Sequence, residues 1–297
     1  MRPTDRTGLA IVLSLVALTL FDSMGLIIKH LSTSYSAAEL SAWRNLFGLI
    51  PSVIALWSSR AWCTGGKRLK IRQWKLALFR GVIVTFAQLC FYMSLGLMAF
   101  ATASTITYAS ALFTTALAIP ILGERVGWVR WIAVLVGFVG VIMVVQPGGD
   151  GFTLYALLPL AAAAFYALVG VTARLFDDDV PSPLVNLYSS VTAVIGAGLI
   201  AYFWGGYQPI ASATDLGWII AMGGFGGTAV LFLIVSYRMT EQSNLAPFSY
   251  FGIPLAFFMG WMFFNEAPWS TLFPGAILIA AGGLLIVWRE RTRSKKA

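Results

Sequence analysis

The stretch "ALTLFDSMGLIIKHLS", residues 17–32, places a single carboxylate, Asp22, inside an otherwise apolar run. An ionised side chain is costly in apolar surroundings, so it is retained where a partner, a proton or a ligand uses it. The apolar run begins at about residue 9, which gives enough length to cross about 30 Å of hydrocarbon. The stretch therefore predicts a membrane-spanning helix with a polar group that serves a function.

The composition of the whole chain agrees with this reading. Of its 297 residues, 59% are hydrophobic and 11% are charged, compared with about 25% charged residues in a typical soluble domain. The mean hydropathy is +0.81. The two cysteines, Cys63 and Cys90, form no CxxC pattern, so we expect no metal site and no disulfide framework, and no motif calls for a cofactor. The N-terminus lacks a small-x-small cleavage site and is read as a retained first helix.

Apolar segments separated by Gly, Pro or charge clusters predict an all-α membrane protein with ten transmembrane helices. One or two of the shorter segments are alternatively re-entrant. The ten segments are 9–30, 38–57, 74–96, 101–122, 128–146, 152–174, 184–204, 214–237, 244–264 and 271–288.

The distribution of Lys and Arg predicts the orientation of these helices. With the N-terminus inside, the outer loops hold no Lys or Arg except Lys29 at the end of the first helix. The inner segments hold the others, apart from Arg44 and Arg80 within predicted helices. This asymmetry follows the positive-inside rule. Both termini are then cytoplasmic in a cytoplasmic or plasma membrane. The lipid bilayer is the expected partner, and the net charge of +8 requires no nucleic acid.

A weak internal repeat divides the chain into residues 1–147 and 148–297. A shift of 142 positions places Tyr108 on Tyr250 and Glu124 on Glu266 without a gap. Five helices are an odd number, so two such halves have opposite orientations in the membrane. Two inverted five-helix repeats favour alternating access around a site between them.

The acidic turns after the fourth helix of each half, "LGERVG" and "FNEAPW", make the chain resemble the drug/metabolite transporter superfamily, in particular its EamA-type branch. The resemblance covers the whole chain. The family's frequent proline in the fourth helix is present as Pro254, whereas the matching position of the first half is Leu112. The resemblance implies movement of small organic molecules through a central cavity without ATP.

The rise of a helix places several polar groups at one depth. Asp22 comes about 12 Å below the outer boundary and Arg44 about 10 Å below it, at about 1.5 Å per residue. Gln88 and Tyr108 come out at nearly the same depth. We therefore predict a substrate site between the halves, with tyrosines of the second half opposite. The predicted lining is Asp22, Arg44, Gln88, Tyr92, Tyr108, Tyr166, Tyr188 and Tyr250.

Three roles for the charged layer remain open at this point. Asp22 and Arg44 grip the two ends of a zwitterion such as an amino acid, or they only neutralise each other and tie two helices together. In the third role Asp22 carries a coupling proton, with burial and Arg44 acting on it in opposite directions. His30, at the outer end of the first helix, is a possible pH-sensing site. Lys29 is expected to extend to the headgroups.

The predicted function is a secondary-type carrier of a small organic metabolite, working by alternating access with proton coupling or exchange. Amino acids and similar zwitterions lead, followed by amines, flavin-like vitamins and nucleobases. No P-loop, GxSxG elbow or HExxH site appears in the sequence, so an enzyme is not expected. A non-transporting membrane receptor or scaffold is the alternative from another class. The sequence is compatible with a monomer or a homodimer.

Overall fold

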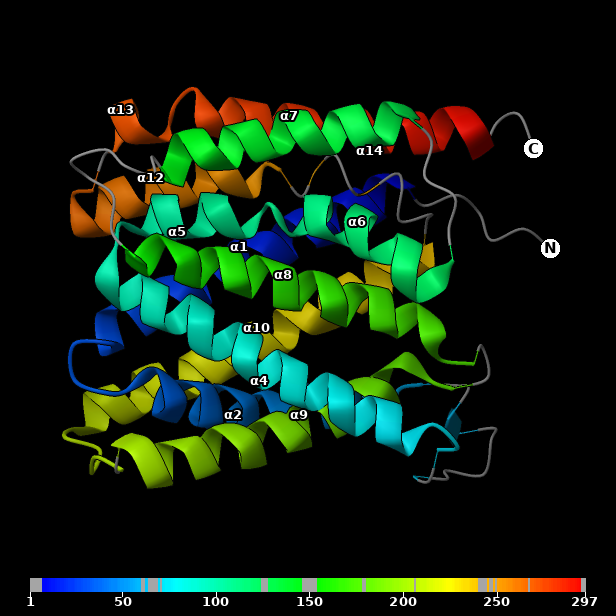
Figure 1. Ribbon diagram of the computed structural model, residues 1–297. Coiled ribbons are helices and arrows are strands. Elements are labelled where there is room, and N and C mark those ends of the chain that lie inside the picture. The colour runs from blue at the N-terminus through cyan, green and yellow to red at the C-terminus, as the bar shows by residue number, and fades with distance from the viewer. Residues whose placement is uncertain are drawn as a thin grey trace.

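The computed structural model is helical throughout the part of the chain that it describes (Figure 1). It describes residues 7–59, 62–63, 69, 71–123, 128–145, 154–177, 180–205, 207–239, 245, 248, 250–266 and 268–294. The helices of the first half are α1 (Thr7–Leu31), α2 (Ala37–Trp57), α4 (Trp74–Leu97), α5 (Phe100–Thr107), α6 (Ser110–Leu122) and α7 (Trp128–Val145). Those of the second half are η1 (Leu154–Ala156), α8 (Leu157–Thr172), η2 (Ala173–Leu175), α9 (Ser182–Ile200), η3 (Ala201–Gly205), α10 (Ala213–Met239), α12 (Gly252–Phe264), α13 (Trp269–Leu272) and α14 (Gly275–Ser294).

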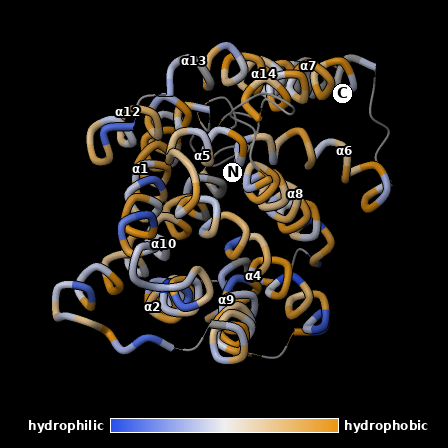
Figure 2. The backbone as a smooth tube through the Cα atoms, turned by 60° about the vertical axis from the view of Figure 1, so that its left-hand side comes forward, coloured by the Kyte–Doolittle hydropathy of each residue, from blue (hydrophilic) through white to orange (hydrophobic). Residues whose placement is uncertain are grey.

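Six helical stretches are long and apolar enough to cross a membrane: Gly8–Leu31, Trp74–Leu97, Phe100–Leu122, Leu154–Leu175, Pro183–Trp204 and Ala213–Leu233. Shorter apolar helices cover Trp131–Val145, Gly252–Phe264 and Gly275–Leu285. The helices are coloured as mostly hydrophobic along their lengths (Figure 2). The beginning of α1 and the end of α14 lie at the same end of the molecule (Figure 1). The chain is a multi-pass membrane protein.

A turn interrupts the fourth segment of each half. The predicted segment 101–122 corresponds to the apolar stretch Phe100–Leu122, which contains such a turn. A turn at Tyr108 separates α5 from α6, and a turn at Tyr250 precedes α12. The hydrogen bonds around the two turns match, because Ala111 N donates to the Tyr108 carbonyl and Ile253 N to the Tyr250 carbonyl, each at 3.1–3.4 Å. Pro254 has no N–H to donate to the carbonyl four residues earlier and is accommodated in the first turn of α12. This accounts for the second break. The first break occurs without a proline.

The fourth segments also end alike. Gly123 after α6 and Asn265 after α12 both have left-handed backbones, with φ of 67° and 55°. A left-handed residue at this place is a common way to terminate a helix. Glu266, which follows Asn265, donates its backbone N–H to the Gly260 carbonyl at 3.1 Å, so it is a helix-end residue as expected. Glu124 lies outside the described residues.

The principal helix contacts join the two halves of the chain. In the first set α1 and α2 pack along α10, in the second α8 and α9 pack along α4, and α7 pairs with α14. The α7–α14 pair forms a layer at one edge of the molecule in both views (Figures 1 and 2). Glycines permit close approach in the first set. A Cβ atom at Gly227 of α10 would stand 3.1 Å from the Gly48 carbonyl oxygen of α2.

Candidate functional site

Asp22 is buried on α1, with 7% of its surface exposed. Its Oδ2 atom is fully covered and has no hydrogen-bond partner among the described residues. The hydroxyl group of Tyr108, at the break between α5 and α6, lies within electrostatic range of this carboxyl group. Ser104 and Thr105, one turn earlier on α5, also hold covered hydroxyl oxygens without a partner in the described part of the chain. Of the residues around the α5 break, Tyr108 is therefore the one linked to Asp22, and Ser104 and Thr105 add hydroxyl oxygens without a partner among the described residues.

Arg44 is buried on α2 and 8% exposed. Its Nη1 donates to Asn45 Oδ1 at 3.0 Å and its Nε to the Met24 sulfur at 3.5 Å. The guanidinium group also lies against Gly226 of α10, where a Cβ atom would stand 2.7 Å from Nε. Within the described ranges no carboxylate lies within 4.0 Å of its nitrogens. Arg44 is thus a buried cation held only by neutral groups.

Neutral polar side chains join α2 to α4 beside Arg44. The Ser41 hydroxyl donates to Gln88 Oε1 at 2.8 Å, and Gln88 Nε2 donates to Asn45 Oδ1 at 3.3 Å. Asn45 Nδ2 in turn donates to the Ser41 carbonyl at 2.8 Å. Gln88 was predicted for the layer, whereas Ser41 and Asn45 were not. Ser41 could have been found, because it lies three residues before Arg44 and four before Asn45, spacings that bring side chains together on a helix. Asn45, directly after Arg44, gave no such signal.

Two of the predicted tyrosines interact electrostatically with the guanidinium group. The hydroxyl groups of Tyr92 on α4 and Tyr166 on α8 both lie within electrostatic range of Arg44. The Tyr166 ring meets Phe91 edge-on at 6.5 Å between ring centroids. Tyr166 was predicted for the wall opposite the charged layer, and the structure brings it to Tyr92 and Arg44 through the packing of α8 along α4.

Three other predicted residues are elsewhere. The Tyr188 hydroxyl donates to the Leu69 carbonyl at 3.1 Å, at the other end of α4. Tyr250 belongs to the apolar cluster of α6, α7, α12 and α14, where a Cβ atom at Gly283 would collide with its hydroxyl group. His30 is exposed at the end of α1 and meets Trp218 edge-on at 6.1 Å. Tyr188 and Tyr250 were predicted from their positions in the internal repeat. Such a position does not determine the direction in which a side chain points.

Asp22 and Arg44 lie on different sides of α1. The side chains of residues two positions apart on an α-helix point about 200° away from each other. Arg44 contacts Met24, so Asp22 points to another side of the helix. Asp22 shares its face of α1 with Gly25 and Lys29, three and seven residues later. The structure accordingly shows no ion pair between Asp22 and Arg44, and gives no support to the purely structural pairing that the sequence left open.

The arrangement suits a ligand with charged ends. Each buried charge lacks an opposite charge among the described residues, and each is surrounded by hydroxyl, amide and aromatic groups that accept or donate hydrogen bonds. Burying an uncompensated charge costs several kcal/mol. A ligand or a proton that neutralises the group removes much of that cost. No group of three or more metal-binding side chains occurs in the described part of the chain.

Several transporters are similar to this chain in sequence. S-adenosylmethionine uptake transporters are similar over almost the whole chain; that of Rickettsia conorii is 26% identical over 293 residues, 97% of this chain and 95% of its own. The riboflavin transporter of Rhizobium johnstonii is 32% identical over 176 residues, 59% of this chain and 57% of its own. A pseudopaline exporter of Pseudomonas aeruginosa is 24% identical over 287 residues, 96% of each chain.

A solved crystal structure has the same fold, with a TM-score of 0.66 and 19% sequence identity over 95% of this chain and 98% of that one. The EamA-like transporter family matches the chain in two consecutive stretches, residues 8–146 and 153–288. These stretches include nearly all of the chain and correspond to a family of transporters, not of enzymes. The chain belongs to the EamA-like transporter family.

Proposed function

We propose that the protein is a secondary-type carrier of a zwitterionic metabolite of the amino-acid type, working by alternating access between two inverted five-helix halves, residues 1–147 and 148–297. The observation that carries the proposal is the pair of buried opposite charges, Asp22 and Arg44, neither of which has a charged partner among the described residues. The small-molecule cargo of the named relatives supports a carrier of small metabolites.

The contact between α7 and α14 supports the inverted repeat. A Cβ atom at Gly140 would stand 2.6 Å from the Gly275 carbonyl oxygen, and one at Gly282 would stand 2.7 Å from the Ala133 carbonyl oxygen. The sequence shift of 142 positions carries Gly140 onto Gly282 and Ala133 onto Gly275. The two contacts are therefore equivalent under exchange of the halves, which is what a two-fold axis relating them produces.

The other helix pairings support the same relation. Exchange of the halves turns the packing of α1 along α10 into that of α8 along α4, and the packing of α2 along α10 into that of α9 along α4. Both members of each pair of contacts are present. Such inverted halves hold their substrate near the middle of the membrane and expose it to each side in turn.

The shape of the charged layer favours an extended zwitterion. Arg44, with Tyr92 and Tyr166 nearby, suits a carboxylate, because a guanidinium group forms paired hydrogen bonds with it. Asp22 and Tyr108, on another side of α1, suit a cationic group. The ends of a compact amino acid are only a few bonds apart. S-adenosylmethionine, the cargo in the names of the Rickettsia relatives, has a carboxylate, an ammonium and a more distant sulfonium.

The distribution of Lys and Arg supports an orientation with both termini in the cytoplasm. The membrane is then the cytoplasmic membrane of the cell. The common position of the beginning of α1 and the end of α14 agrees with an even number of crossings (Figure 1). Lys29 and the α4–α5 junction then face outward. The names of the relatives include both uptake and export, so the proposal concerns the cargo and not its direction.

Counterflow in proteoliposomes tests the proposal. Vesicles preloaded with unlabelled solute receive labelled glycine, lysine, S-adenosylmethionine, riboflavin, a polyamine or a nucleobase. We expect saturable exchange of an extended zwitterion, lost in Asp22→Asn and in Arg44→Gln and kept in Asp177→Asn, which changes an exposed acid. Exchange of riboflavin alone would favour a vitamin carrier. No exchange by folded protein would favour a receptor or scaffold.

Coupling is tested on the same vesicles. If Asp22 binds the cationic group of the substrate, imposing a pH gradient leaves the accumulation of substrate unchanged. If Asp22 carries a coupling proton, a gradient drives uptake in the wild type, and Asp22→Asn retains exchange while losing the gradient-driven accumulation. Loss of exchange in Asp22→Asn without any effect of the gradient supports the substrate-binding role.

A further inference from the structure

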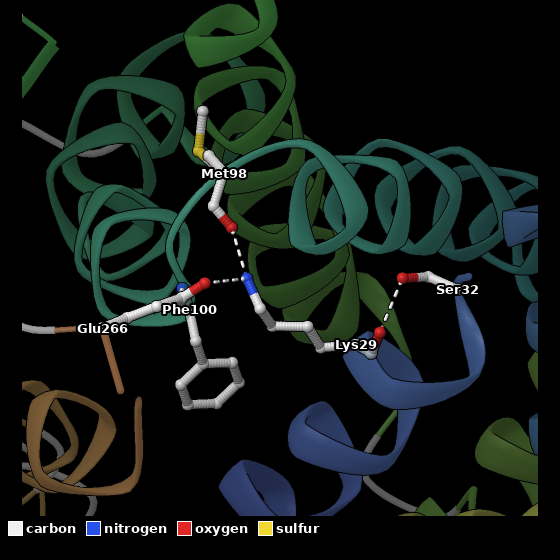
Figure 3. Close-up of polar contacts among 5 residues, drawn as sticks. All are labelled: Lys29, Ser32, Met98, Phe100 and Glu266. Atoms are coloured by element: carbon white, nitrogen blue, oxygen red, sulfur yellow. Dashed lines mark hydrogen bonds and ion pairs between the residues drawn. The ribbon is translucent and has the colours of Figure 1, made fainter. Parts of the chain in front are cut away.

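Lys29 forms an ion pair with Glu266 at the end of α1 (Figure 3). The distance from Lys29 Nζ to Glu266 Oε1 is 2.8 Å. The pair connects α1 of the first half with the residue that terminates α12 of the second half. The sequence predicted that Lys29 extends to the headgroups, and that Glu266 is only a helix-end residue. The structure corrects the first expectation and extends the second.

The ion pair also satisfies the ends of two helices. Lys29 Nζ donates to the carbonyl oxygen of Met98, after α4, at 2.7 Å. The backbone N–H of Phe100, the first residue of α5, donates to Glu266 Oε2 at 2.9 Å. A cation at a helix C-terminus and an anion at a helix N-terminus are both favourable. The two side chains thus hold the α4–α5 junction of the first half against the second half (Figure 3).

The pair is partly shielded from solvent. The Lys29 side chain is 12% exposed and that of Glu266 is 28% exposed. Exposed salt bridges contribute little to stability, but a shielded pair with additional hydrogen bonds is costly to break by removing one partner. Lys29 Nζ also lies 5.3 Å from the centre of the Phe264 ring. Separation of α1 from the end of α12 must disrupt all of these interactions together.

The pair lies above Asp22 on the same face of α1. Asp22, Gly25 and Lys29 follow one stripe of the helix, and Lys29 is about 10 Å beyond Asp22. Between them α1 meets Phe100, where a Cβ atom at Gly25 would stand 2.9 Å from the ring. Phe100 belongs to a buried cluster that includes Ile28 and Leu95. Apolar packing and the ion pair thus lie between the level of Asp22 and this end of the molecule.

We propose that the Lys29–Glu266 ion pair is a latch that holds this end closed, and that it separates when substrate enters or leaves there. The inference rests on the proposed alternating access, because it is the relative movement of the halves that breaks the latch. Hydrogen bonds join the halves at the opposite end, such as those from Gln73 Nε2 to the Leu175 carbonyl at 3.0 Å and to Asp177 Oδ1 at 3.3 Å. Loss of the latch shifts the protein toward the state that is open at the Lys29 end.

Chemical labelling of a reporter cysteine tests the latch without any substrate. Ser104, buried between the level of the latch and that of Tyr108, is changed to Cys in a Cys63→Ser, Cys90→Ala background. A membrane-impermeant maleimide is added from the Lys29 side. Glu266→Gln removes the charge but keeps an oxygen for the Phe100 N–H. We expect it to increase the labelling rate about tenfold, as a shift of about 1.4 kcal/mol does.

Three comparisons make the result specific. Lys29→Met should act like Glu266→Gln, and the exchange Lys29→Glu with Glu266→Lys should return the rate toward that of the parent. Asp177→Asn removes an acid at the other end but keeps the side-chain oxygen that accepts from Gln73 Nε2, so it should leave the rate unchanged. An unchanged rate in folded Glu266→Gln protein would overturn the latch, as would an equal rise in the exchanged variant. Neither result depends on whether counterflow identifies a substrate. The proposal of a latch and the proposal of a carrier can therefore be refuted independently.

Discussion

The guanidinium group of Arg44 rests on Gly226 of α10, where the absence of a side chain leaves it room. A Cβ atom at this glycine would stand 2.7 Å from Nε and 2.6 Å from the Met24 sulfur. Glycine inside a helix costs about 1 kcal/mol relative to alanine, so α10 would gain helical stability from a larger residue. Glycine at position 226 therefore lowers the helix stability of α10 but leaves the room that the Arg44 guanidinium group occupies.

We predict that Gly226→Ala raises the KM for the transported solute about tenfold, because the guanidinium group must move away from the carboxylate that it binds. Gly224→Ala is the matched control, since a Cβ atom at Gly224 meets nothing within 4 Å. The control should keep full transport and at least parental thermal stability. Concentration-dependent uptake by the two variants, compared at equal amounts of folded protein, measures the difference. Equal KM values would contradict the placement of the carboxylate at Arg44.

A second prediction separates two tyrosines that the sequence placed in one wall. Tyr166→Phe should reduce transport two- to tenfold, because a neutral hydrogen bond contributes about 0.5–1.5 kcal/mol and Tyr166 stands beside Arg44. Tyr188→Phe should have little effect on KM, since its hydroxyl group is engaged by Leu69. Uptake assays on both variants test this. A larger loss in Tyr188→Phe would return that tyrosine to the site.

Depth could be predicted from the sequence, whereas the direction of side chains could not. Helices have a fixed rise, so counting residues from a boundary predicted Asp22, Arg44, Gln88 and Tyr108 at one depth. The structure links Gln88 to Asn45, the neighbour of Arg44, by a hydrogen bond. Counting residues does not show which neighbour a side chain faces, and Tyr250 therefore faces Gly283 instead of the charged layer. The direction depends on helix rotation, which packing with distant segments decides.

Two other features depended on partners far away in the chain. Lys29 is a typical headgroup-binding residue by position, and nothing near it in sequence indicates Glu266 or the Met98 carbonyl. The break at Tyr108 has no proline to announce it, although its counterpart at Tyr250 is followed by Pro254. The repeat was the available signal, because a break in one half predicts a break at the matching position of the other.

The α7–α14 contact yields a prediction about stability. Gly140→Ala and Gly282→Ala each place a methyl group within 2.6–2.7 Å of a carbonyl oxygen of the facing helix. Overpacking of this kind costs about 1–3 kcal/mol, and the two-fold relation predicts similar losses for both variants. Gly170→Ala on α8 is the control, because nothing lies within 4 Å of its added Cβ atom. Thermal unfolding in detergent compares the three. Very unequal losses at Gly140 and Gly282 would argue against equivalent halves.

Asn45 offers the sharpest test of the charge that Arg44 receives. Its Oδ1 accepts from Arg44 Nη1 at 3.0 Å, so Asn45→Asp places a carboxylate of nearly the same shape beside the guanidinium group. The new ion pair should occupy Arg44 and exclude the carboxylate of the substrate. We expect the KM for the zwitterion to rise at least about tenfold. Thermal stability should fall modestly, because a carboxylate cannot donate to the Ser41 carbonyl as Asn45 Nδ2 does.

The decarboxylated analogue of the same solute supplies the control for Asn45→Asp. It has no carboxylate for Arg44, so its inhibition of uptake should be unchanged or stronger in the variant. Competition assays with both compounds measure the two effects in one preparation. Parallel weakening of the zwitterion and of its decarboxylated analogue would show that Asn45→Asp damages the site as a whole, and that Arg44 does not select for a carboxylate.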